Sequence, residues 1–313
     1  MKPTVPLAAL ALPILLSCSA RAAATRVVAN AVTGSRGLIY ETDDDPELIR
    51  AAVPFGLKAM EALLDEHPDH VGLLTSLSSG FTQFGYAFVQ ADAEQADLEG
   101  QSAAARVFRE RARKLFLRAR DYGRRGLDVR HPGLSRKLSS ARDLDPALAE
   151  LKREDLPLVY WTAASWALAI AAGKEDMGLV AELPVPGALM RRALAIDEAW
   201  NDGALHEFFV PWDAAQGGAE GLRRATEHFD RAMVLSHGKR LSLIVSFAEA
   251  VLVAKQDRAE FTRLLTQVAS ADVESDRDHR LGNVLAKRRA KLLLAHAEEL
   301  FASLWPSGQG GQT

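Results

Sequence analysis

Apolar residues recur along most of the chain at alternating steps of three and four, the spacing of one face of an α-helix. The first such stripe comprises Ile49, Val53, Leu57, Met60 and Leu64. Similar stripes run from Leu74 to Phe88, from Phe108 to Gly126, and in several segments between Leu222 and Leu292. We find no convincing segment with the strict alternation of a β-strand. The pattern predicts an all-α protein.

Several predicted helices also carry a tetratricopeptide-like spacing, in which a small residue, a bulky residue four positions later and another residue three positions beyond that precede a turn. Examples are Ala225, Phe229 and Ala232 before His237, and Gly56, Met60 and Leu63 before Pro68. The turn at His131 does not keep this spacing, and Ser135 to Asp155 must lie between repeats. We therefore predict a tetratricopeptide-like α-solenoid of about four helical hairpins with inserted helices.

The boundaries of the helical domain follow from local signals. Asp45, Pro46 and Glu47 combine an N-cap, a proline at the first helical position and an early acidic residue. We expect the helical domain to cover residues 43–305. Small and polar residues over 18–42 predict a flexible tether, and residues 306–313 a disordered tail.

The N-terminus contains an export signal. An apolar run from Val5 to Leu16 follows Lys2 and leads to Leu15-Leu16-Ser17-Cys18, which has the pattern of a lipobox. Cys18 is the only cysteine of the chain, so we predict a signal peptide over 1–17 and acylation of Cys18. Ser19 after that cysteine favours sorting to the outer membrane. The alternative is cleavage after Ala22, which would release a soluble periplasmic protein.

Charge excludes one class of partner. The chain has 38 basic and 41 acidic residues, so nothing favours nucleic acid. The helix predicted from Arg106 to Arg125 is strongly basic, whereas Asp272 to Asp278 is acidic. The basic residues either form a solvated face or meet anionic lipid or an acidic protein. Pairing of these two patches between protomers would give a homo-oligomer.

The segment Leu156 to Ala172 has no charged residue and contains Tyr160, Trp161 and Trp166. A helix that is apolar on all sides is typical of the centre of a large helical fold. Trp161 and Trp166 are five residues apart and so lie on different helix faces. One of them can pack in the core while the other lines a concave binding surface.

The other candidate site is His206-Glu207-Phe208. A zinc protease motif would need a second histidine four residues after His206, where Val210 stands. The sequence also lacks a nucleophile elbow, a phosphate loop and a dinucleotide fingerprint. We therefore predict no catalytic residue, no metal site and no cofactor. The predicted ligand- or partner-binding residues are Tyr160, Trp161, Trp166, His206, Glu207 and Phe208.

Several segments together resemble one known family. They include His228 to Lys239, Pro54 to Lys58, Tyr160 to Ala164, Ala204 to Phe208, Gln256 to Phe261 and Arg280 to Asn283. They are similar to the TatT family, tetratricopeptide-like lipoproteins associated with TRAP transporters, and the similarity extends from Asp43 to Phe301. This chain departs from the family pattern at His237, where a glycine is usual, and at Ser17, where Gly or Ala is common.

The resemblance implies an all-helical, oligomeric accessory protein whose partner is a TRAP-type periplasmic substrate-binding protein. We accordingly expect a non-catalytic scaffold that holds this partner, or its ligand, in a groove or pore lined by helix faces. The alternative hypothesis is a carrier that binds a hydrophobic small molecule directly.

Overall fold

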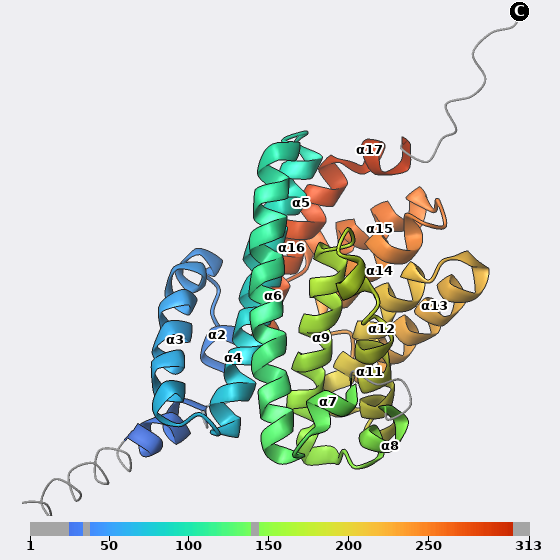
Figure 1. The fold of residues 1–313 in the computed structure, drawn as a ribbon. Helices are drawn as coiled ribbons and strands as arrows, with labels where there is room; N and C mark the ends of the chain where they lie inside the picture. Colours follow the sequence, from blue (N-terminus) through green and yellow to red (C-terminus); the bar gives the residue numbers. More distant parts are fainter. Residues whose placement is uncertain (1–24, 34–37, 139–143, 303–313) are drawn as a thin grey trace, which may run out of the picture.

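The computed structural model describes residues 25–33, 38–138 and 144–302, and these contain helices and no β-strand (Figure 1). The prediction of an all-α protein is confirmed. The finer arrangement, a solenoid of about four hairpins, stays a prediction. The predicted signal peptide, Cys18 and the tail 306–313 lie outside the described residues.

The first half contains α2 (Leu38–Glu41), α3 (Pro46–Glu66), α4 (Val71–Phe84), η2 (Gly85–Gln90), α5 (Ala91–Leu98), α6 (Ser102–Arg130), α7 (Leu134–Leu138), α8 (Leu144–Ala149), η3 (Arg153–Asp155) and α9 (Leu156–Ala172). The second half contains α10 (Met177–Val180), α11 (Pro184–Ile196), η4 (Trp200–Gly203), α12 (Ala204–Ala215), α13 (Gly218–Leu235), α14 (Leu241–Phe247), η5 (Ala248–Leu252), α15 (Arg258–Ser270), η6 (Arg277–His279), α16 (Arg280–Ala295) and α17 (Ala297–Ala302).

Helix α3 begins where the sequence predicts. The Asp45 carboxylate accepts hydrogen bonds from the backbone N–H groups of Glu47 and Leu48, at 3.0 and 3.1 Å. These bonds satisfy two of the amides that have no partner inside the helix. Pro46 is the first helical residue, and α3 continues past Pro54 as far as Glu66.

Part of the segment predicted as a tether is helical in the structure. Residues 25–33 form a helix, and Ala29 is fully buried in the main apolar cluster. The Thr25 hydroxyl lies 2.8 Å from His67 Nε2, and Asn30 Oδ1 lies 2.9 Å from His70 Nε2. The buried methyl group and the two hydrogen bonds hold this helix against the junction of α3 and α4. A flexible tether does not describe residues 25–33.

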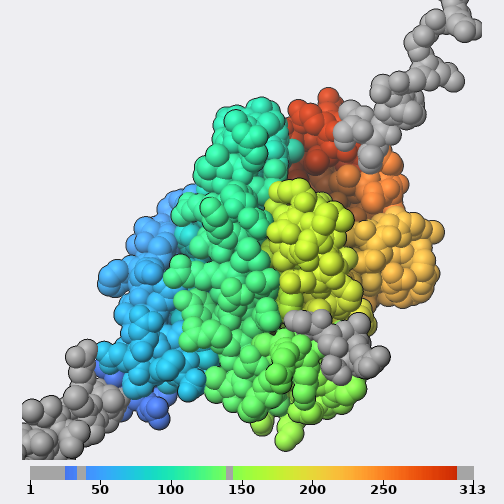
Figure 2. All heavy atoms as spheres, in the orientation of Figure 1, coloured from blue at the N-terminus to red at the C-terminus, as the bar shows by residue number. Residues whose placement is uncertain are grey.

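The long helix α6 forms much of the face seen in Figure 2, where it is drawn in green. The positive charge predicted for this face is partly neutralised within the molecule. Its ion pairs with carboxylates include Arg109–Asp97, Arg113–Glu110, Arg118–Glu61 and Arg120–Glu182. Local pairing therefore accounts for much of the basic stripe.

Beside α6 lies α9, the uncharged helix predicted to be buried (Figure 1), and the two helices approach each other closely. Trp166 of α9 is only 1% exposed. The approach depends on two glycines of α6. A Cβ atom at Gly123 would lie 2.2 Å from Thr162 Oγ1, and one at Gly126 would lie 2.8 Å from Leu158 Cδ1.

We expect Gly123→Ala to reduce the free energy of unfolding by about 2 kcal/mol, because the added methyl group forces α6 away from Thr162. Urea denaturation measures this change. The control is Gly282→Ala in α16, where an added Cβ meets no atom within 4 Å. It should be neutral or slightly stabilising, because alanine favours helix more than glycine does. Equal behaviour of the two variants would contradict the close-packing argument.

The apolar core has two parts, and α12 belongs to both: Phe209 packs in the first cluster and Val210 in the second. The C-terminal helix α16 returns to the N-terminal helices α2 and α3. Arg280 pairs with Asp44 at 2.7 Å, and Arg288 with Glu47 at 2.7 Å. Neighbouring helices thus form a closed circuit in the order α3, α4, α6, α9, α11, α12, α14, α16 and back to α3.

Candidate functional site

Within the described residues, two π-helical segments, η2 and η5, interrupt otherwise regular helices. Such segments are frequent at functional sites. Each contributes to one group of polar side chains: η2 carries Tyr86 and η5 carries Glu249. We call this group the central polar cluster; its members are Tyr86, Glu94, Tyr160, Glu207, Arg240, Ser242, Glu249 and Arg289.

The first ion pair of the cluster joins Glu207 of α12 to Arg240, which precedes α14. Arg240 Nη2 lies 2.6 Å from Glu207 Oε2, and Ser242 Oγ donates to Glu207 Oε1 at 2.8 Å. The two charged side chains are only 18% and 19% exposed. Burial acts to lower the pKa of Arg240, but Glu207, Tyr160 and Asp202 together outweigh it and the pKa is raised. Pairing thus compensates the lost hydration of both ions.

The second ionic group is centred on Arg289 of α16. Its Nη2 atom lies 2.5 Å from Glu249 Oε1 and 3.0 Å from Glu94 Oε2. Burial raises the pKa of Glu249, although its carboxylate is paired. The Arg289 Nη1 atom is buried and has no hydrogen-bond partner among the described residues. Its hydrogen-bonding capacity is therefore unused among the described residues.

Tyr86 of η2 combines exposure to water with a neighbourhood of charged side chains. The residue is 54% exposed to water, yet burial, aided by nearby Glu94 and Glu249, raises the pKa of its phenol. The charges that act on this phenol come from four different elements, with Glu94 on α5, Glu207 on α12, Glu249 on η5 and Arg289 on α16. We infer that Tyr86 faces a hollow enclosed by protein, hereafter the central hollow.

Tyr160 extends the cluster to α9. Burial, reinforced by the charge of Glu207, raises the pKa of Tyr160 to about 12. Its ring lies 4.9 Å from that of Trp161 and 5.1 Å from that of Trp200, measured between ring centres. The structure thus brings three of the predicted residues, Tyr160, Trp161 and Glu207, to one region.

The remaining predicted residues lie elsewhere. Trp166 is in the core, where its indole N–H donates to Glu182 Oε2 at 2.7 Å. Phe208 stacks on Trp212, with ring centres 5.3 Å apart. His206 contacts His228 and Glu198 rather than the cluster around Glu207. The structure therefore does not bring the six predicted residues into one site.

Sequence reasoning missed the other six members of the central polar cluster: Tyr86, Glu94, Arg240, Ser242, Glu249 and Arg289. The sequence offers one sign of a buried charged residue, which is a single charge within a stripe of apolar residues. Glu249, for example, stands between the buried residues Phe247 and Val251. Charged residues in such positions are rarely buried without a partner, so each one invites a search for an opposite charge elsewhere in the chain.

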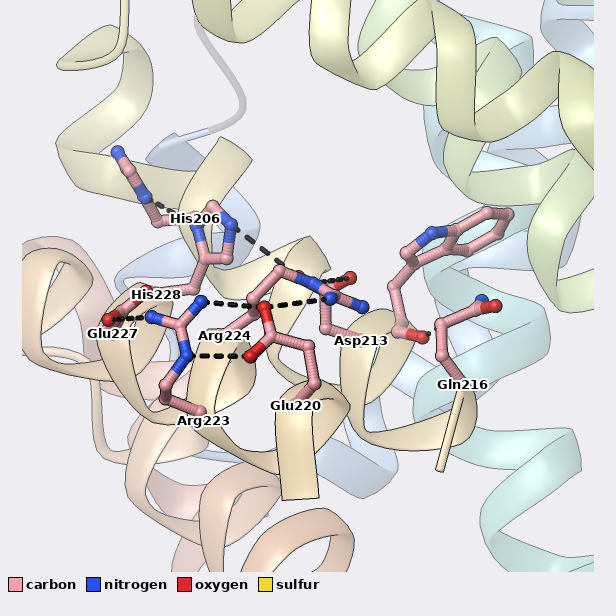
Figure 3. A network of polar contacts seen from close by, with 9 residues as sticks. His206, Asp213, Gln216, Glu220, Arg223, Arg224, Glu227 and His228 are labelled. Carbon is pink, nitrogen blue, oxygen red and sulfur yellow. Dashed lines mark hydrogen bonds and ion pairs between the residues drawn. The ribbon is translucent and has the colours of Figure 1, made fainter. Parts of the chain in front are cut away.

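His206 and His228 form a separate polar contact between α12 and α13 (Figure 3). Their Nδ1 atoms are 2.8 Å apart, so one must donate and the other accept. His206 Nε2 also lies 3.3 Å from Glu198, and His228 Nε2 lies 3.6 Å from Asp213. Burial lowers the pKa of both histidines, and the proximity of His206 lowers that of His228 further.

Acidification should weaken this contact. Because both folded-state pKa values lie below the ordinary value of 6.5, the unfolded chain binds protons first as the pH falls. The contribution of the two neutral histidines to the free energy of unfolding is therefore present above pH 6.5 and is lost as the pH falls below it. We expect the thermal midpoint to fall between pH 7.5 and pH 5.5, and to fall less in the variant His228→Phe. An equal decrease in the two proteins would contradict this role of the pair.

The described part of the chain offers no group of three or more His, Cys, Asp or Glu side chains placed to hold a metal ion. Nor does any helix in that part combine the length and apolar character needed to cross a membrane.

Comparison with known proteins adds two findings. The model of the family described as TRAP transporter T-component matches residues 42–301. An uncharacterised protein of Treponema pallidum (strain Nichols) is 27% identical over 273 residues, which cover 84% of this chain and 82% of that protein.

Proposed function

Because the chain belongs to the TRAP transporter T-component family, we propose that it is a non-catalytic accessory protein of a TRAP-type uptake system. In this proposal acyl chains on Cys18 anchor it on the periplasmic side of the outer membrane. It holds a TRAP-type periplasmic substrate-binding protein, or the ligand of that protein, at the central hollow.

The central polar cluster is the observation that carries the proposal. Buried ion pairs are often less stabilising than apolar residues of the same volume, so stability alone does not explain two of them in one interior. The Tyr86 ring, which is 54% exposed, can contact a guest molecule, and beside it the buried Arg289 Nη1 atom lacks a hydrogen-bond partner among the described residues. A few polar groups among apolar walls are typical of ligand sites.

The proposed architecture supports the same function. Stacked helical hairpins curve and present a continuous concave surface. In this chain α16 returns to α3, so a solenoid of about four hairpins would enclose its concave surface. A partner that docks at the rim could then pass a small ligand into the hollow.

Affinity purification from detergent-solubilised membranes tests the proposed partner. We expect the unsubstituted chain to recover a TRAP-type substrate-binding protein, and Tyr86→Ala to recover less. Phe55→Ser is the matched control, because Phe55 is 80% exposed on α3 and is not part of the cluster. Recovery of unrelated proteins alone would refute the scaffold.

The mass of the mature protein tests the anchor. A protein that begins at Cys18 with added acyl chains supports lipid anchoring. An unmodified thiol refutes it, and a chain that begins at Ala23 supports the alternative cleavage.

The second candidate function is a carrier that binds a hydrophobic small molecule directly. The contact of Tyr160 with Trp161 and Trp200 favours it, because aromatic walls suit an apolar guest. Native mass spectrometry separates the two functions: a carrier should retain a ligand without its protein partner, and a scaffold should not.

A further inference from the structure

A pocket lies beside α12, between α11 and α13, and has a volume of about 630 Å³. We call it the α11–α13 pocket. Its apolar lining includes Leu194, Phe209 and Trp212, and its charged lining includes Arg191, Asp213 and Arg224. Figure 3 shows Asp213 and Arg224 beside one another at this site. The volume and the mixed lining are those of a small-molecule site.

The α11–α13 pocket is distinct from the central hollow. Successive residues of a helix are rotated by about 100°, so residues two, six and nine positions after Glu207 lie on the opposite side of α12. These are Phe209, Asp213 and Gln216, and all three line the pocket. Glu207 points instead to Arg240 and Ser242. A ligand in the pocket therefore meets none of the ion pairs of the central polar cluster.

The charges of the pocket leave one cation uncompensated. Asp213 lies 3.4 Å from Arg224 and 3.6 Å from His228, and Arg224 is also 3.3 Å from Glu220. Arg191, in contrast, has no hydrogen bond or ion pair with any described residue and is exposed. A guanidinium group can bind a carboxylate through two parallel hydrogen bonds. With Asp213 close by, a singly charged anion fits better than a doubly charged one.

The apolar wall is rigid. A Cβ atom at Gly187 would lie 2.7 Å from Trp212 Cζ2, so the indole packs directly on the α11 backbone. The ring of Phe208 stacks on the same indole at an interplanar angle of 27°. Trp212 is thus held between the α11 backbone and Phe208 of its own helix before any ligand arrives, and this reduces the entropy lost on binding.

We propose that the α11–α13 pocket binds an amphipathic monocarboxylate. Arg191 holds the carboxylate, and the apolar body of the molecule lies against Trp212 and Leu194. This site is additional to the proposed function at the central hollow and does not depend on it.

Isothermal titration calorimetry with 4-phenylbutyrate tests the proposal on the full mature chain. We expect the variant Arg191→Gln to raise the dissociation constant roughly tenfold or more, the loss typical of a charge-assisted hydrogen bond. Arg111→Gln on α6 is the matched control, because Arg111 is likewise exposed and unpaired among the described residues. It should bind as the unsubstituted chain does. The neutral 4-phenylbutanamide should bind roughly tenfold more weakly than the carboxylate.

Three results would overturn the proposal: no binding of 4-phenylbutyrate to the unsubstituted chain, equal binding of the amide, or unchanged binding to Arg191→Gln. Loss of binding in Arg240→Gln with retention in Arg191→Gln would assign the ligand to the central hollow instead. The comparison of acid and amide needs no substitution, so the test stands even if a variant fails to fold.

Discussion

Replacing Arg240 with methionine should lower the free energy of unfolding by about 3 kcal/mol, since it leaves the buried Glu207 carboxylate without its cation. Methionine keeps most of the apolar stem of arginine, so the loss reports mainly on the charge. Ser242 alone would remain as a hydrogen-bond partner of Glu207. Urea denaturation at pH 7.5 measures the change.

The control is Arg231→Met, which breaks the ion pair with Glu198. There the side chains are 43% and 48% exposed, and an exposed pair contributes about 0–1 kcal/mol. Adding Glu207→Gln to Arg240→Met should restore part of the lost stability, because it removes the uncompensated charge. If Arg240→Met and Arg231→Met were equally stable, Glu207 and Arg240 would not be a buried pair in solution.

A double variant of Glu207 and Arg240 can show whether this ion pair serves stability or recognition. The double variant Arg240→Met/Glu207→Leu replaces the ions with apolar groups, and such replacements are often neutral or stabilising. A variant that folds as well as the unsubstituted chain but recovers less of the substrate-binding protein would assign the pair to recognition. This comparison needs no knowledge of the ligand.

Most of the fold could be predicted because helices leave a periodic signal. The N-cap at Asp45 and the uncharged helix Leu156–Ala172 both follow from local pattern and are present in the structure. Local pattern did not decide which tryptophan of that helix is buried: Trp166, predicted to bind a ligand or partner, lies in the core. The helix over 25–33 was missed because its stability comes from contacts outside it, with His67 and His70.

The site could be predicted only in part, because it is assembled from distant parts of the sequence. Tyr86, Glu249 and Arg289 meet only because α16 returns to the N-terminal helices. Conversely, His206 and Glu207 are neighbours in the sequence but do not share a site. Neighbours in a helix differ by about 100° in direction, so His206 reaches His228 whereas Glu207 reaches Arg240. Because His206 and Glu207 are adjacent in the sequence, we predicted that they belong to one site. In the structure they lie in two different environments.

Arg289→Met should have an effect as large as that of Arg240→Met, and one that depends on pH. The substitution leaves the carboxylates of Glu94 and Glu249 close together without their shared cation. We expect a loss of about 3 kcal/mol in the free energy of unfolding at pH 7.5.

The sign of the pH dependence follows from Glu249. Burial already raises its folded-state pKa above the ordinary value of 4.5, and removal of Arg289 raises it further. A carboxyl group with a raised pKa stabilises the folded state at low pH, and this stability is lost as the pH rises through that pKa. The loss of stability in Arg289→Met should therefore be smaller at pH 5 than at pH 7.5.

Arg263→Met is the control, because its pair with Glu260 is exposed and its small effect should not grow with pH. A defect of the same size at both pH values would mean that Arg289 acts through packing, and that Glu249 is not held ionised by it.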